Sequence, residues 1–152
     1  MTLTPKDSGW IEVITGSMFS GKTEELIRRI RRAEIAKMKT ILFKPFIDSR
    51  YSSKHVVSHN KSKLESVMVK SSDEIIKHSN KMDVIGIDEA QFFDNQIVEV
   101  CKKLADKKIR VIVAGLDTDY KGKPFGCMPE LMCESDYLDK LRAICVLSLI
   151  HI

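Results

Sequence analysis

Residues 16–23 are the segment that most constrains how this chain can fold. Their sequence, GSMFSGKT, fits the pattern G-x-x-x-x-G-K-[ST] and lies between an apolar, β-branched run at 10–15 and a segment with helical periodicity. In such a loop the glycines let successive backbone N–H groups point into one concavity, where they and the helix N-terminus can hold a chain of phosphates. A strand before the pattern and a helix after it therefore predict a nucleoside triphosphate site.

Two side chains of this loop are expected to supply most of its chemistry. The Lys22 ammonium can reach the β- and γ-phosphates, and the Thr23 hydroxyl can bind Mg²⁺. The residues predicted to form the triphosphate site are Gly16, Ser17, Met18, Phe19, Ser20, Gly21, Lys22 and Thr23.

Two adjacent carboxylates, Asp88 and Glu89, stand at the end of a second buried-type strand at 84–88. An acid at the end of a buried strand downstream of a phosphate loop is placed to hold Mg²⁺ beside Thr23. Glu89, one residue further on, could take a proton from an attacking nucleophile. The alternative is a polar loop without function, and the phosphate loop favours the functional interpretation.

Apolar runs and helical periods alternate along the chain. Strands are predicted at 10–15, 41–43, 64–69, 84–88 and 111–116, and helices at 23–38, 71–80 and 97–105. The polar segment 46–63 is expected to be a long loop. Continuous apolar strands separated by helices predict one α/β domain, a parallel sheet covered by helices on both faces.

Composition excludes several classes of protein. The 152 residues carry a net charge of +4 and contain no apolar run near the roughly 20 residues of a membrane span. The N-terminus has no signal peptide pattern, and the cysteines show no C-x-x-C pair, which favours the reducing cytoplasm. The basic run 28–32 is expected to form a solvated or subunit-facing helix surface, so neither nucleic acid nor membrane is predicted as a partner.

Four segments in register resemble the cytosolic, zinc-containing thymidine kinases. They are the loop 16–23, the sequence DSRYSS at 48–53, the sequence IDEAQFF at 87–93, and GLD at 115–117 with KPFG at 123–126. The resemblance runs from about residue 10 to residue 145 and implies a P-loop (RecA-like) kinase domain over 1–145, an α/β fold with a parallel sheet flanked by helices.

The resemblance implies a reaction and a set of roles. The reaction is transfer of the ATP γ-phosphoryl group to the 5′-hydroxyl of thymidine or deoxyuridine, giving the monophosphate for DNA synthesis by pyrimidine salvage. Glu89 would be the general base, Lys22 and Arg50 would stabilise charge on the transferring group, and Asp88 with Gln91 would belong to the ATP–Mg²⁺ side. The residues implied to pack around the base are Met18, Phe92, Leu116, Tyr120 and Phe125.

The resemblance also implies a homotetramer, dTTP as a feedback inhibitor, and a structural zinc in a C-terminal subdomain with a lasso loop. Cys145 resembles the first zinc ligand, but residues 146–152 resemble nothing in the family. We therefore expect a chain truncated or frame-disrupted after residue 145, without the zinc and the lasso. Whether such a chain is active stays open at this point.

A second function fits the residues without the family. A P-loop ATPase or ATP-binding module could use Glu89 to activate water, with no nucleoside acceptor. A kinase should consume ATP in proportion to added thymidine, whereas an ATPase should not respond to it.

Overall fold

The computed structural model describes residues 9–47, 55–57 and 63–142, and its main element is one sheet of six strands. In spatial order the strands are β5 (Val67–Val69), β2 (Thr40–Pro45), β6 (Val84–Ile87), β7 (Arg110–Leu116), β1 (Trp10–Gly16) and β8 (Tyr137–Leu141). Every neighbouring pair is parallel. The predicted parallel sheet is therefore confirmed.

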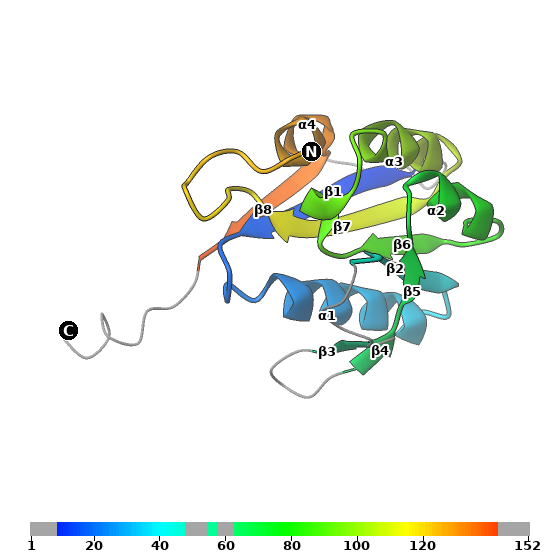
Figure 1. Ribbon diagram of the computed structural model, residues 1–152. Helices are drawn as coiled ribbons and strands as arrows, with labels where there is room; N and C mark the ends of the chain where they lie inside the picture. Colours follow the sequence, from blue (N-terminus) through cyan, green and yellow to red (C-terminus); the bar gives the residue numbers. More distant parts are fainter. Residues whose placement is uncertain (1–8, 48–54, 58–62, 143–152) are drawn as a thin grey trace, which may run out of the picture.

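Helices cover both faces of this sheet (Figure 1). One face carries α1 (Lys22–Ile35), and the other carries α2 (Asp73–His78), α3 (Ile97–Asp106) and α4 (Met128–Glu134). A 3₁₀ turn, η1 (Ala90–Phe92), follows β6. A small antiparallel pair, β3 (His55–Val57) with β4 (Lys63–Glu65), lies on the α1 side (Figure 1).

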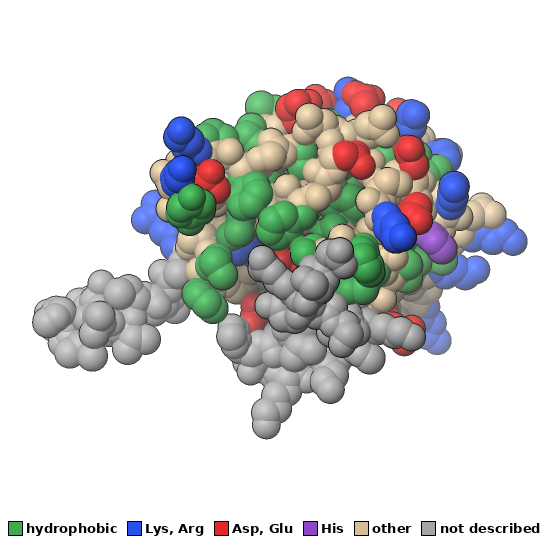
Figure 2. All heavy atoms as spheres, in the orientation of Figure 1, with side chains coloured by type: hydrophobic (Ala, Val, Ile, Leu, Met, Phe, Trp, Pro, Cys, Tyr) green, Lys and Arg blue, Asp and Glu red, His purple; other side chains and the backbone are tan. Residues whose placement is uncertain are grey.

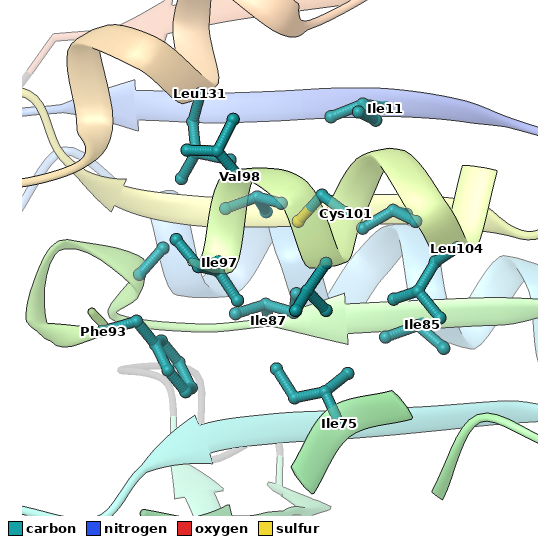
Figure 3. Packing of buried hydrophobic residues seen from close by; sticks show 14 of the residues in the cluster. Ile11, Ile75, Ile85, Ile87, Phe93, Ile97, Val98, Cys101, Leu104 and Leu131 are labelled. Carbon is teal, nitrogen blue, oxygen red and sulfur yellow. The ribbon is translucent and has the colours of Figure 1, made fainter. Parts of the chain in front are cut away.

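The core consists of two apolar clusters, one on each face of the sheet. Strand β1 contributes to both because successive side chains alternate between faces: Ile11 and Val13 pack toward α3, and Ile14 packs toward α1. Figure 3 shows the larger cluster, where Ile97, Cys101 and other α3 side chains point onto the strands. Burial on both faces is the physical reason why the strands read as continuous apolar runs.

Helix α1 begins at Lys22 and ends at Ile35, three residues before the predicted end. Lys37 adopts the left-handed conformation with φ 65°. Its N–H donates to the Glu34 carbonyl and the Met38 N–H donates to the Ala33 carbonyl, which is a Schellman motif. The chain reverses there although the apolar spacing continues to Met38.

Three other predictions of secondary structure were wrong or incomplete. The segment 46–63 is not only a loop, because β3 lies within it and β4 begins at its end. The segment 64–69 is not one strand, because its halves pair in different sheets. Helix α4 and strand β8 were not predicted.

The basic run on α1 contributes to the interior as well as to the surface. The Arg29 guanidinium bonds the carboxylates of Glu12 and Asp139, at 2.9 Å and 2.6 Å. Glu12 is buried within β1 and also accepts hydrogen bonds from Arg110 and Trp10. Although burial acts to raise it, these donors hold the pKa of Glu12 below its ordinary value.

Candidate active site

The carboxyl ends of the parallel strands meet at one edge of the sheet, and a cavity opens there. Its volume is about 400 Å³. The cavity is lined by Met18, Phe19, Lys22, Thr23, Lys44, Asp88, Glu89, Gln91, Gly115 and Leu116. These residues come from the loop after β1 with the start of α1, from the end of β2, from the turn after β6 and from the end of β7, so four separate segments build one site.

The loop between β1 and α1 depends on its two glycines. Gly16 has φ 146° and Gly21 has φ 91°, values that L side chains rarely adopt. A Cβ atom on Gly16 would lie 2.4 Å from the carbonyl oxygen of Leu141, at the end of β8. Gly16 therefore lets the loop between β1 and α1 pack directly on the neighbouring strand.

Lys22 begins α1 and lies against its own loop. Its ammonium donates to the Ser17 carbonyl at 2.7 Å. Burial lowers the pKa of Lys22, although nearby carboxylates act in the opposite direction, Asp88 most strongly. The amine is thus partly desolvated and surrounded by acids, the setting in which a phosphate oxygen is a favourable new partner.

Thr23 and Asp88 come together from α1 and from the end of β6. The Thr23 hydroxyl donates to Asp88 Oδ2 at 3.2 Å. Two oxygens that bind one Mg²⁺ lie about 3 Å apart, and Mg²⁺ commonly takes one or two protein oxygens together with phosphate and water. The donor chemistry and the spacing of this pair therefore fit Mg²⁺.

Asp88 is buried, and this burial changes its ionisation. Burial, with the adjacent charge of Glu89, raises the pKa of Asp88 to about 6, against an ordinary value of 3.8. The backbone N–H of Glu89 donates to Asp88 Oδ1 at 2.9 Å and favours the carboxylate. A cation bound nearby would stabilise the ionised form of this buried carboxyl group.

Glu89 projects toward the cavity from a strained position. It is in the left-handed region, with φ 49° and ψ 46°, directly before η1. Its Oε2 atom forms an ion pair with the Lys44 ammonium, at a distance of 3.1 Å. Lys44 was not predicted from the sequence, because a lysine near the end of an apolar strand carries no local pattern that marks a site.

Gln91 lies between the ends of β6 and β7 and lines the same cavity. Its side-chain oxygen accepts the Leu116 N–H at 3.0 Å. The buried amide therefore holds the end of β7 in place. Contact between Gln91 and the nucleotide, expected from the resemblance, stays a prediction.

The five residues expected around the base are only partly gathered. Met18 and Leu116 line the cavity. Phe92 packs edge-on against Phe125, with ring centroids 5.5 Å apart. Tyr120 is 91% exposed in the loop between β7 and α4. Figure 2 shows hydrophobic and charged side chains side by side over this loop, which Figure 1 draws in yellow and orange.

Two predicted site residues, Arg50 with its segment 48–53 and Cys145, lie outside the described residues. Within the described ranges, no group of three or more His, Cys, Asp and Glu side chains is arranged to hold a metal ion. The pair of Thr23 and Asp88, whose oxygens are spaced as Mg²⁺ ligands would be, is smaller than such a group.

None of the helices in the described part of the chain has the length and apolar composition of a membrane span.

Comparison with known protein families gives one finding. The family described as thymidine kinase matches residues 9–149, which is most of the chain. The match reaches beyond residue 145, so a foreign end beginning at residue 146 stays a prediction.

Proposed function

The chain belongs to the thymidine kinase family, and on that premise we propose that it transfers the γ-phosphoryl group of ATP to the 5′-hydroxyl of thymidine. The observation that supports this most strongly is the convergence of Lys22, Thr23, Asp88 and Glu89 on one cavity. A phosphate loop, a magnesium pair and a candidate base within one site are the parts that phosphoryl transfer requires.

In the proposed reaction the 5′-oxygen attacks the γ-phosphorus as the bond from this phosphorus to the β–γ bridging oxygen breaks. ADP leaves with the electron pair of that bond, and Glu89 accepts the proton of the hydroxyl. Lys22 neutralises charge that develops on the phosphate oxygens. The products are the nucleoside 5′-monophosphate and ADP.

Thr23 and Asp88 would hold Mg²⁺ on the triphosphate side of the cavity. When bound, Mg²⁺ neutralises phosphate charge and orients the phosphate chain. The raised pKa of Asp88 supports this assignment. Burial disfavours the ionised form of this carboxyl, and a bound cation would stabilise that form.

The nucleoside would lie on the side of Met18 and Leu116, with the Phe92–Phe125 pair beyond them. Flat apolar faces can hold a nucleobase, and the sugar hydroxyl would then face Glu89. By the same resemblance we propose that Arg50 steadies the transferring group and that Tyr120 closes toward the base.

The test is formation of thymidine monophosphate from Mg²⁺-ATP by the purified chain, resolved by chromatography, with Glu89→Gln as the control. We expect product that requires thymidine and falls by about 10²- to 10⁴-fold in the variant. ADP release that ignores thymidine would support the alternative ATPase function. Tight ATP binding without any turnover would support an ATP-binding module instead of a kinase.

The family also suggests how the enzyme is used. We propose a cytoplasmic homotetramer that is inhibited by dTTP and that serves pyrimidine salvage for DNA synthesis. Light scattering of the purified chain would test the tetramer, and dTTP titration of the thymidine-dependent rate would test the inhibition. A monomer at all concentrations would contradict the assembly without bearing on the reaction.

A further inference from the structure

Lys44 is a cation of the cavity to which neither the sequence patterns nor the family comparison gives a role. Its ammonium lies 3.1 Å from Glu89 Oε2, and both side chains line the cavity that holds Lys22 and Thr23. We infer that Lys44 is a positioning residue that holds the Glu89 carboxylate in place for proton transfer. The inference rests on the proposed role of Glu89 as the base.

The backbone on both sides of Lys44 is fixed. The carbonyl of Phe43 accepts the Asp88 N–H at 2.9 Å, and the Phe46 N–H donates to the Val69 carbonyl at 2.8 Å. Strand β2 is thereby tied to β6 on one side and to β5 on the other. Lys44 therefore leaves the sheet at a defined point opposite Glu89.

Glu89 needs such a partner more than a residue within a helix or strand would. It stands at the turn between β6 and η1. Its side chain is 34% exposed, so water competes for the carboxylate, and three χ angles let it turn away from the cavity. A carboxylate held through one oxygen keeps the other available to accept a proton.

The burial of Lys44 separates this pair from an ordinary surface ion pair. The Lys44 side chain is only 17% exposed, against 44% for Lys102, which pairs with two glutamates on the helical surface. Exposed pairs contribute little because water and salt screen them. Partial desolvation strengthens the contact of Lys44 with Glu89 and makes its geometry more defined.

The experiment is a double-mutant cycle on the thymidine-dependent rate. Lys44→Met should lower kcat by about 10- to 100-fold and change the thymidine KM by less than about threefold, since the lysine acts on the base. In the Glu89→Gln background the same change should alter kcat by less than about twofold, because no base remains to be positioned. Lys44→Arg should recover most of the rate.

Other outcomes would overturn the inference. Equal losses from Lys44→Met in both backgrounds would show that the ammonium acts directly on phosphate rather than through Glu89. An unchanged rate would show that the ion pair has no role in turnover. The matched control is Lys102→Met, which removes the two surface ion pairs of this α3 lysine and should leave kcat unchanged.

Two further readouts separate this inference from the proposed acceptor. If the chain releases ADP without thymidine, thymidine is not the phosphoryl acceptor. The double-mutant cycle of Lys44 and Glu89 can then be measured on the rate of ADP release, and it still tests Lys44. Crystal structures of the wild-type chain and of Lys44→Met test it without turnover. We expect the Glu89 carboxylate to leave its position in the variant, and an unmoved carboxylate would overturn the inference.

Discussion

The proposed phosphate side and the proposed nucleoside side of the cavity are built differently. On the phosphate side, the Thr23 hydroxyl donates to the Asp88 carboxylate, and Lys22 and Asp88 are each hydrogen-bonded to backbone. On the nucleoside side, Phe92 and Phe125 form one T-shaped ring contact, and Tyr120 is almost fully exposed. One half of the site is joined by hydrogen bonds of its functional side chains. The other half is held by the backbone hydrogen bonds of the loop at 117–125 and leaves its aromatic side chains partly free.

This difference follows from how each half is encoded. A phosphate chain is recognised by one contiguous loop and one strand end, whose geometry is set locally. A nucleobase is enclosed by side chains from several loops, whose positions depend on distant contacts. Substitutions should therefore affect chemistry on the first side and nucleoside affinity on the second.

The largest effect is expected from Lys22→Met. The variant removes the cation nearest the phosphate loop, and we expect the thymidine-dependent rate to fall by about 10³-fold, or about 4 kcal/mol. Lys77→Met on α2 is the matched control and should keep the wild-type rate. If the steady-state rate of Lys22→Met falls by less than tenfold, the loop side of the cavity is not where the chemistry depends most on side chains.

Asp88→Asn should show how much the buried charge costs the fold. The pKa of Asp88 in the folded chain, about 6, lies above its ordinary value of 3.8, so the folded state favours the protonated form. The stability from this group is present below pH 3.8 and is lost as the pH rises through 6.

An asparagine at position 88 cannot ionise, so the variant should not lose this stability as the pH rises. In Mg²⁺-free urea unfolding, the variant should match the wild type near pH 4 and exceed its free energy of unfolding by up to about 3 kcal/mol at pH 8. A difference independent of pH would mean that burial does not govern Asp88. The variant should also lose the Mg²⁺ dependence of ATP binding.

Gln91→Ala tests the link between the two halves of the site. It leaves the half-buried Leu116 N–H without its partner, which should cost about 1 kcal/mol of folding free energy. We also expect the thymidine KM to rise more than the ATP KM, since Leu116 lies on the nucleoside side. Gln96→Ala, at an exposed glutamine before α3, should change neither quantity. Equal changes in both KM values would show that Gln91 serves the whole cavity.

The smallest effect is expected from Tyr120→Ala. Because the side chain is 91% exposed, thermal unfolding should not change. If the ring closes on the base, the thymidine KM should rise by about five- to tenfold, or about 1 kcal/mol, with kcat retained. Tyr137→Ala in β8 should leave that KM unchanged. An unaltered KM in Tyr120→Ala would remove this residue from the nucleoside side.

The sequence predicted those parts of the fold that are buried on both sides. The central strands have apolar side chains on both faces, and α1 and α3 each bury one apolar stripe, so their patterns are strong. Strand β8 was missed because it is an edge strand whose side chains are mostly exposed, which leaves no apolar run. Helix α4 has only seven residues, too few for a helical period to be distinct.

The same limit applies to the site. Residues 16–23 and Asp88 were predicted because a contiguous pattern marks them. Lys44 could not be found in this way, since its importance lies in a 3.1 Å contact with Glu89, 45 positions away in the chain. Likewise, nothing local shows that Gln91 bonds the backbone of Leu116.

The conformation of Glu89 has a consequence for anyone who engineers this enzyme. At φ 49° a glycine would relieve strain of about 1 kcal/mol and would also remove the acid next to buried Asp88. A library screened only for heat resistance would therefore enrich glycine at position 89. The selected variants would be well-folded proteins without their proposed base. A selection for thermal stability therefore has to include an activity assay or keep glutamate at position 89.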